Sequence, residues 1–315
     1  MSAQGLSSRA IIGAYYQRLE QNPGLEWVTA LSNYFLSDQE SETYKWLGQV
    51  PAMREWVGGR QAKGFTENGI TIANRHFEAT LEVLVKELRR DKTGQILVRV
   101  NELADRTNSH WASLISTLIA NGESQVCYDG QYFFDTDHPV VGGGTQSNKL
   151  DIDISELPTE VHGTTAIPST EEMQLAILKC VQQLYGFKDE AGEPLNENAR
   201  SFVVMVPTDM WFVAKAAVAA PVITHGQTNI AKVMDEVSLS VAQNPRLTWG
   251  DKFAVFRTDG SVKPFIRQEE DPVRIDAIAE GSELEFKEKK HHYGVDTWRN
   301  VGYGFWQHAC LGQLL

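Results

Sequence analysis

The segment from Tyr44 to Arg60 reads YKWLGQVPAMREWVGGR, and the segment from Thr71 to Glu78 reads TIANRHFE. Between them, Glu67-Asn68-Gly69 is typical of a tight hairpin turn, because Asn and Gly tolerate the positive φ that such turns need. The returning segment alternates, with apolar residues on one side at Phe77, Ala79, Leu81, Val83 and Val85. A period of two predicts a strand with one buried and one wet face. We therefore predict a long β-hairpin over residues 43–86.

Such a hairpin needs a surface to lie against. A two-stranded hairpin is marginal alone in water, and exposed Trp side chains need cover. Positive charges on the hairpin suit an acidic surface on a neighbouring molecule. The residues of this hairpin that we predict to contact such a neighbour, and so to serve assembly, are Trp46, Arg54, Trp56, Val57, Arg60, Lys63 and Arg75.

Other segments predict helices and further strands. The strongest helix signal covers residues 95–121, where apolar residues recur at steps of three and four: Ile96, Val100, Leu103, Trp111, Leu114, Ile115 and Leu118. Further helices are predicted at residues 11–19 and 27–35, after a cap at Ser169 or Thr170, and after a cap at Thr208 and Asp209. Strands are predicted at 202–206, 253–256, 262–266, 284–289 and 298–311, with a short hairpin at 127–138 and a loop at 142–168. Because helices and strands do not alternate regularly, the predicted fold class is α+β.

The composition excludes several classes of function. The 315 residues carry a formal net charge of −12, which argues against a general nucleic-acid binder. Residues 129–197 hold 13 acidic residues against three lysines. No run of 18 apolar residues exists, so we expect no membrane partner. The N-terminus lacks the pattern of a secretory signal, and three distant cysteines are typical of reduced thiols.

One cluster has residues of catalytic type. Asp135, Asp137 and His138 could bind a divalent metal or hold a nucleophilic water, with His162 and Asp151 completing the site. The alternative is structural, with Phe134, Asp137 and His138 bracing a turn before Pro139. Gly142 to Lys149 lacks the glycine that precedes the lysine of a phosphate-binding loop. We predict no cofactor, no metal and no catalytic residue.

The sequence resembles a known family at this point. Tyr44-x-Trp46-Leu47-Gly48, Pro51, Glu55-Trp56-Val57-Gly58-x-Arg60 and Ile72-Ala73-Asn74-x-x-Phe77-Glu78 resemble the Mu-like phage major head subunit family. The Gly130, Phe134 and Asp137-His138 pattern resembles it too, as do Gly192-x-Pro194-Leu195 and Val206-Pro207. Members of this family have the Hong Kong 97 capsid fold.

The resemblance implies five regions: an N-terminal arm (1–42), an extended loop (43–80), a peripheral domain with a long spine helix (81–199), an axial domain (200–264) and a return to the peripheral domain (265–315). It implies hexamers and pentamers of an icosahedral shell around double-stranded DNA, assembled in the bacterial host cytoplasm and found in the virion. The residues also allow the arm to be a simple surface helix pair.

The resemblance also implies partners. These are other copies of the chain, a portal, decoration proteins, and DNA met by non-specific proximity only. We expect a separate scaffold and protease, because only about 42 residues precede the hairpin and they lack long charged heptads. If the peripheral domain lines the shell, we expect most of Asp151, Asp153, Glu156, Glu160, Glu171 and Glu172 to face the DNA and repel it, and the alternative is a generic solvated face. Two alternatives stay open: an encapsulin-like compartment shell, and a metal-dependent hydrolase using Asp135, Asp137 and His138.

Overall fold

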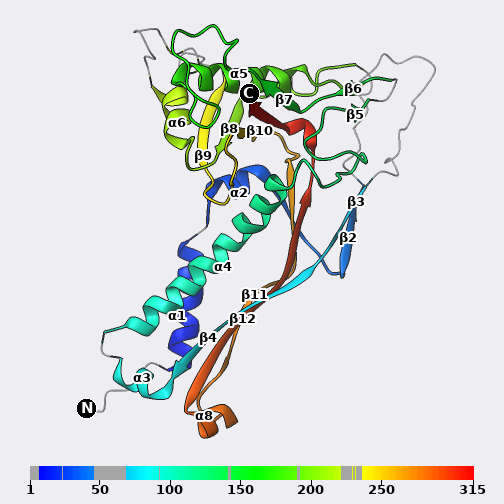
Figure 1. The fold of residues 1–315 in the computed structure, drawn as a ribbon. Coiled ribbons are helices and arrows are strands. Elements are labelled where there is room, and N and C mark those ends of the chain that lie inside the picture. The colour runs from blue at the N-terminus through cyan, green and yellow to red at the C-terminus, as the bar shows by residue number, and fades with distance from the viewer. Residues whose placement is uncertain are drawn as a thin grey trace, which may run out of the picture.

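The chain folds into a long stem and an upper lobe, shown in the computed structural model of Figure 1. The structure describes residues 7–22, 24–45, 69–91, 93–140, 143–189, 192–220, 229, 231 and 236–315. The stem is built on a four-stranded sheet of order β1-β11-β12-β4, and the upper lobe on a five-stranded sheet of order β7-β13-β10-β8-β9. The N-terminal end of the described chain lies at the foot of the stem, and the C-terminus lies in the upper lobe.

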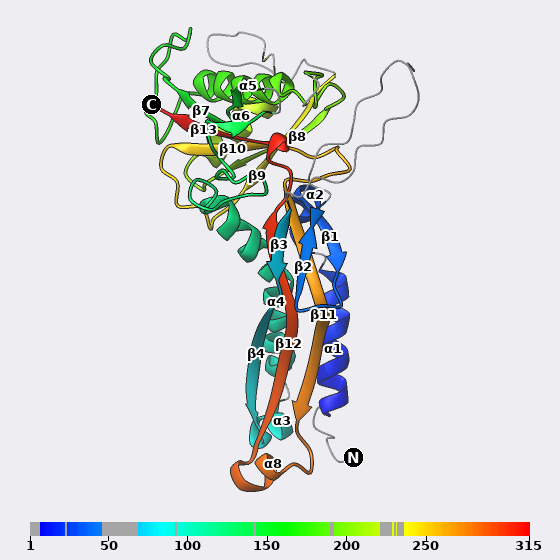
Figure 2. The same cartoon turned by 90° about the vertical axis from the view of Figure 1, so that its right-hand side faces the viewer.

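Two strands of 14 residues each run the length of the stem. They are β11 (Phe265–Ile278) and β12 (Lys290–Tyr303), joined at the foot by the short helix α8 (Glu283–Glu288). Outside them lie β4 (Arg75–Leu84), antiparallel to β12, and β1 (Ser32–Leu36), parallel to β11. Figure 2 shows this narrow sheet with the helices behind it.

The long helix α4 (Gln95–Ala120) covers one face of the stem sheet, as the apolar periodicity predicts. Ile96, Val100 and Ile115 are buried, whereas Leu103, Trp111, Leu114 and Leu118 are only partly buried. Small or polar residues complete the buried stripe: Ala104, Thr107, Ala112 and Ser116, together with Ile119. They allow close packing, which a search for large apolar residues does not detect.

The first helix, α1 (Ser8–Gln21), lies along α4 of its own chain. Ile11 and Tyr15 are fully buried in a cluster with Val100 of α4 and Tyr293 of β12. The Arg18 guanidinium donates two hydrogen bonds of 2.8 Å to the Asp105 carboxylate. Among the described residues, the first helix of the expected N-terminal arm therefore packs on its own subunit.

The predicted long hairpin is wrong for its returning end, residues 75–84. Among the described residues, the strands β2 (Ser41–Tyr44) and β3 (Ile70–Ala73) form the base of a hairpin, from Ser41 opposite Ala73 to Tyr44 opposite Ile70, and residues 46–68 lie outside the described part of the chain. The alternating strand β4 pairs with β12 instead. Alternation shows that a strand is half-buried, but it carries no information about which strand lies beside it.

The upper lobe contains the largely buried strands β8 (Ser201–Val206) and β13 (Ala309–Leu314), with β7 (Lys149–Ile152), β9 (Ser238–Gln243) and β10 (Lys252–Arg257). Its helices are α5 (Thr170–Gly186) and α6 (Trp211–Ala219). Ser169 caps α5 as predicted, in a capping box with Glu172. The boundary predicted at residue 200 falls inside this lobe, because β7 and α5 precede it and β13 returns to it from the C-terminus.

Several local predictions are wrong. Residues 284–288 of the strand predicted at 284–289 lie in α8, which begins at Glu283 because Ser282 caps it, and residues 32–35 form β1 instead of extending α2 (Glu26–Leu31). The N-cap of α6, predicted at Thr208 and Asp209, is Met210, and its side chain forms no capping hydrogen bond.

The loop predicted at residues 142–168 contains two strands: β6 (Thr145–Gln146), which pairs with β5 (His138–Pro139), and β7. The short hairpin predicted at residues 127–138 is reduced to one antiparallel bridge, between Val126 and Tyr132. The remaining elements are α3 (Val85–Arg90) and the 3₁₀ turn at Trp306–His308, which interrupts the predicted last strand.

Candidate functional site

The base of the extended loop is fixed to the stem. Six of the predicted assembly residues, Trp46, Arg54, Trp56, Val57, Arg60 and Lys63, lie outside the described residues. The seventh, Arg75, is exposed at the start of β4. At the loop base, the Tyr44 hydroxyl donates a 2.8 Å hydrogen bond to Gln268 Oε1 on β11. Ile72 packs so closely on Gly302 of β12 that a Cβ there would lie 2.3 Å from its Cδ1.

A buried polar side chain locks this base further. Gln268 is fully buried and donates from Nε2 to the Ile72 carbonyl at 3.2 Å and to Asn74 Oδ1 at 2.8 Å. Asn74 in turn donates to the Gln39 carbonyl at 2.8 Å. Buried amides that satisfy one another hold a single geometry, because each unmet bond costs about 1–3 kcal/mol. The two ends of the loop therefore leave the stem from a rigid platform.

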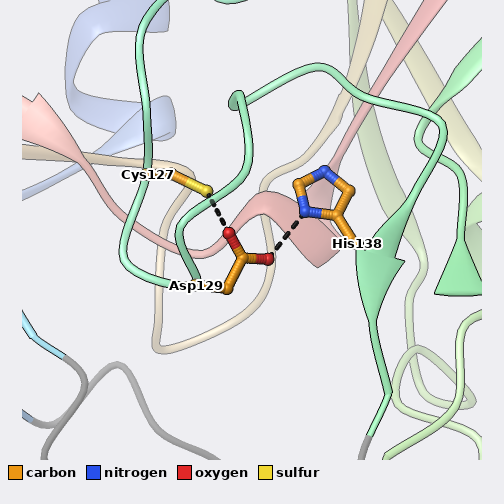
Figure 3. A group of neighbouring side chains, drawn as sticks. All are labelled: Cys127, Asp129 and His138. Atoms are coloured by element: carbon orange, nitrogen blue, oxygen red, sulfur yellow. Dashed lines mark hydrogen bonds and ion pairs between the residues drawn. The ribbon is translucent and has the colours of Figure 1, made fainter. Parts of the chain in front are cut away.

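The second candidate site surrounds His138, which is fully buried. Its Nδ1 lies 2.7 Å from Asp129 Oδ2, and its ring stacks on Trp306 with centroids 3.8 Å apart. The Cys127 thiol donates to Asp129 Oδ1 at 3.0 Å. Figure 3 shows the carboxylate of Asp129 between the two other side chains. Sequence reasoning missed Asp129, although its place in the tight turn Tyr128-Asp129-Gly130 could have marked it.

Asn148 fixes the other side of the imidazole. It is fully buried, its Oδ1 accepts a hydrogen bond from the Asp135 backbone N–H at 2.8 Å, and its Nδ2 donates to the Phe133 carbonyl at 2.7 Å. These two bonds set the orientation of the amide, so Oδ1 faces His138 Nε2 at 3.3 Å. The imidazole is thus held between Asp129 and Asn148 and bridges the turn after α4 to the strand that enters the upper sheet.

The structure does not assemble the predicted hydrolase group. Asp137 is exposed, and the Asp135 carboxylate accepts hydrogen bonds from the backbone of Tyr132 and Thr136. His162 pairs instead with Glu172, with 2.9 Å between Nδ1 and Oε1. Phe134 is buried and lies against Phe133.

The ligand atoms of Cys127, Asp129 and His138 all lie within 4.8 Å of one another, a spacing that a metal site also shows. Burial, and then the nearby Asp129 carboxylate, raise the pKa of the Cys127 thiol far above its ordinary value. Burial raises the pKa of Asp129, but hydrogen bonds from His138 and Cys127 outweigh it and hold that pKa below its usual range. The Cys127 thiol and the His138 imidazole both lie at hydrogen-bond distance from the Asp129 carboxylate, so the three side chains can act as a hydrogen-bonded brace.

We expect His138→Ala to destabilise the subunit by about 1–3 kcal/mol, because it removes one hydrogen-bond partner from the largely buried Asp129 carboxylate and one from the buried amide oxygen of Asn148. Urea unfolding followed by tryptophan fluorescence measures the loss. The control is Asp137→Ala, an exposed neighbour whose removal should change the free energy of unfolding by less than about 0.5 kcal/mol. If His138→Ala changes the free energy of unfolding as little as Asp137→Ala does, the brace does not stabilise the subunit.

A buried charge cluster between α4 and the stem sheet was not predicted. Arg299 is 2% exposed and donates to His110 Nδ1 at 3.1 Å and to the Thr107 carbonyl at 3.2 Å. Its guanidinium lies 4.6 Å from the ring centroid of Trp111 and 3.9 Å from Glu269 Oε1. Burial, with Arg299 beside it, lowers the pKa of His110 to about 4, so His110 is a neutral acceptor. The sequence signal that could have predicted this cluster is Arg299 itself, a charged residue at an inward-facing position of a strand.

The expectation that six carboxylates face the DNA is wrong for two of them. Glu171 is 7% exposed, and Glu172 is fully buried. The Glu172 carboxylate accepts hydrogen bonds from the backbone N–H groups of Gly163 and Ser169. Glu172 thus completes the cap of α5, and the burial of both glutamates shows that acidic composition alone does not indicate an acidic surface.

Comparison with known proteins gives consistent matches. The model of the family described as Mu-like prophage major head subunit gpT matches residues 12–156 and 234–313. The Mu-like prophage FluMu major head subunit of Haemophilus influenzae is 24% identical over 289 residues, covering 91% of this chain and 66% of the relative. The major capsid protein of Escherichia phage Mu is 38% identical over 104 residues, 33% of this chain and 34% of the relative. The chain therefore spans less than two thirds of the length of these relatives.

Solved structures share the fold. A subunit in the procapsid of bacteriophage JBD30 superposes with a TM-score of 0.57 at 22% identity, covering 98% of this chain and 76% of that one. The virus-like particle from Pyrococcus furiosus gives a TM-score of 0.52 at 10% identity, covering 97% and 98%. Among the described residues, no helix is long and apolar enough to cross a lipid bilayer.

Proposed function

Because the chain belongs to the Mu-like prophage major head subunit gpT family, we propose that it is a major capsid subunit that builds the head of a phage or prophage. The observation that carries this proposal is the family match over both the stem and the C-terminal strands. The fold supports it, since the α+β architecture is that of phage capsid subunits, as the resemblance implied. The family is one of structural shell proteins.

The shell we propose is icosahedral, made of hexamers and pentamers of this chain around double-stranded DNA. The stem corresponds to the peripheral domain, with α4 as its spine helix. The upper lobe corresponds to the axial domain, because β8, α6, β9 and β10 all belong to it. This assignment moves β7, α5 and β13 into the axial domain, in contrast to the boundaries expected from the sequence. The extended loop that reaches the next subunit is expected at residues 43–80, of which residues 46–68 lie outside the described part of the chain.

Partners of the shell follow as proposals. We expect a separate scaffold and protease, a portal, and decoration proteins, with DNA met only by proximity. Assembly takes place in the cytoplasm of the bacterial host, and the finished shell is the virion capsid.

The alternative functions have less support. The hydrolase needs His138 beside Asp135 and Asp137, but His138 contacts Asp129 and Asn148 instead. An encapsulin-like compartment has a subunit of the same fold class, but the family match is to head subunits of Mu-like prophages.

The proposal predicts that the purified chain assembles into rings, tubes or closed shells instead of staying monomeric. Negative-stain electron microscopy and light scattering over a range of protein and salt concentrations measure this. A stable monomer under all those conditions would contradict the proposed function. Discrete small particles that hydrolyse a substrate with a bound metal would favour the enzyme instead.

A further inference from the structure

A cavity of about 300 Å³ lies between α4 and the edge of the stem sheet that β4 and β12 form. Figure 2 shows this edge, with α4 running behind the two strands. Apolar side chains from all three elements line the cavity: Phe77 and Ala79 of β4, Leu103 of α4 and Val295 of β12. Apolar walls with a few polar groups are typical of sites for small molecules, and the volume is that of a small site of this kind.

Buried polar side chains also line the cavity, namely Thr107, Thr297 and Arg299, and with them the half-buried His110. Arg299 Nε donates to His110 Nδ1 at 3.1 Å, so the neutral imidazole carries its proton on Nε2 and is a hydrogen-bond donor there. Among the described residues, Arg299 Nη1 has only Glu269 Oε1 as a partner, at 3.9 Å, which is too far for a hydrogen bond. The cavity therefore contains a guanidinium group that can still donate.

The buried groups beside the cavity carry an excess of positive charge. The guanidinium groups of Arg267 and Arg299 lie 5.5 and 4.6 Å from the ring centroid of Trp111. Glu269 is the carboxylate that acts on both of them, and it also accepts a hydrogen bond from the Tyr34 hydroxyl. Arg267 Nε is buried and has no hydrogen-bond partner among the described residues. Two guanidinium groups against one carboxylate leave one positive charge unbalanced, which is costly away from water.

The charged residues at the rim of the cavity do not balance this excess. Glu78 and Arg106 both line the cavity, but both are exposed and their charges are opposite. Glu78 accepts a hydrogen bond from Thr80 Oγ1 at 3.0 Å, and Arg106 pairs with Glu102 of α4 at 2.8 Å. Water and salt screen exposed charges, so neither residue acts strongly on the buried guanidinium groups. A negative charge bound inside the cavity would balance them.

We propose that this cavity binds a small organic anion that has one carboxylate and one flat apolar body. The carboxylate accepts hydrogen bonds from Arg299 and His110, and the apolar body fills the space that Phe77, Leu103 and Val295 line. A neutral molecule of the same shape leaves the excess charge unbalanced, so the site selects for the carboxylate. The ligand contacts α4, β4 and β12 at once and holds the helix to the sheet. This site goes beyond the proposed function and does not depend on it.

A pair of ligands on the full-length chain tests the charge selectivity. The probe is 2-naphthoate, because it joins a flat apolar ring system to one carboxylate, and the matched neutral ligand is naphthalene-2-carboxamide. Isothermal titration calorimetry measures both at neutral pH. We expect one 2-naphthoate per chain, bound at least about tenfold more tightly than the amide, because a hydrogen bond to a charged group is stronger than one between neutral groups. Equal affinities of the two ligands, or no binding of 2-naphthoate at millimolar concentration, would overturn the proposal.

A pair of substitutions tests the place of binding. Ala79→Phe adds a ring to the wall of the cavity at an exposed position of β4, and it should weaken the binding of 2-naphthoate at least about tenfold. The control is Ala120→Phe, at the exposed last residue of α4, which does not line the cavity and should keep the wild-type affinity. Circular dichroism checks the fold of both variants, and Leu103→Phe replaces Ala79→Phe if the latter does not fold. Wild-type affinity in a folded cavity variant would place the probe elsewhere and overturn the site.

Discussion

Replacing residues 46–68 with an Asn-Gly turn is expected to yield a folded, monodisperse subunit that forms no shells. Tyr44 and Ile70 are paired across β2 and β3, so a tight turn can close the hairpin without disturbing its base. Gln268 and Tyr44 continue to hold that base to β11. Circular dichroism measures folding, and electron microscopy with light scattering measures assembly, which we expect to fall below detection.

A second variant tests whether residues 46–68 assemble the shell through their side chains or only through the length of chain that they provide. A Gly/Ser linker of the same length as residues 46–68 keeps the reach of the segment but removes Trp46, Trp56 and the arginines. It should fail to assemble as completely as the short turn. Normal shells from either variant would contradict the extended-loop assignment.

Removing the buried guanidinium of Arg299 is expected to have the largest effect of any single substitution on the stability of the stem. Arg299→Met keeps the length of the side chain but removes the cation beside Glu269, which is 7% exposed and keeps its hydrogen bond from the Tyr34 hydroxyl, and it removes a donor from the Thr107 carbonyl. Breaking a buried ion pair on one side costs about 3–5 kcal/mol. Urea unfolding of the assembly-defective loop variant measures this loss without interference from shell contacts.

Arg274→Met provides the matched control. Arg274 lies on β11 of the same sheet, its side chain is 67% exposed, and it pairs with Asp276 at 2.8 Å. Exposed ion pairs contribute about 0–1 kcal/mol, so this substitution should have little effect. If both arginine substitutions cost less than about 1 kcal/mol, the buried cluster does not hold α4 to the stem sheet.

The sequence predicted those elements whose signal is local. The α4 periodicity, the capping of α5 by Ser169 and the alternation of β4 are each written in a few consecutive residues. The partner of β4 is not, because β12 lies about 200 residues further along the chain, and pairing depends on the whole fold. The segment 284–289 was misassigned as a strand, since Leu284, Phe286 and the charges between them fit both periods over so short a run.

The candidate sites show the same limit. His138 and Phe134 stood out in the sequence, and both are buried where a brace needs them. The partners that define the role of His138 are Asp129 and Asn148, on the two sides of it in sequence, and only the folded turn brings them together. Arg299 meets residues from β11 and α4, so no local pattern could have placed it.

The path of the C-terminal chain has a mechanical consequence. From Lys290 to Leu314 it crosses the whole molecule, first as β12, then through the turn at Trp306–His308, then as β13. Gly304 lets this turn fit, since a Cβ there would lie 2.4 Å from the Lys263 carbonyl oxygen. Hydrogen bonds between antiparallel strands lie across the strand direction. A force that stretches the stem lengthwise therefore loads the hydrogen bonds from β12 to β11 and to β4 in shear, all at once. The strand resists such a force more strongly than one that would break these hydrogen bonds one after another.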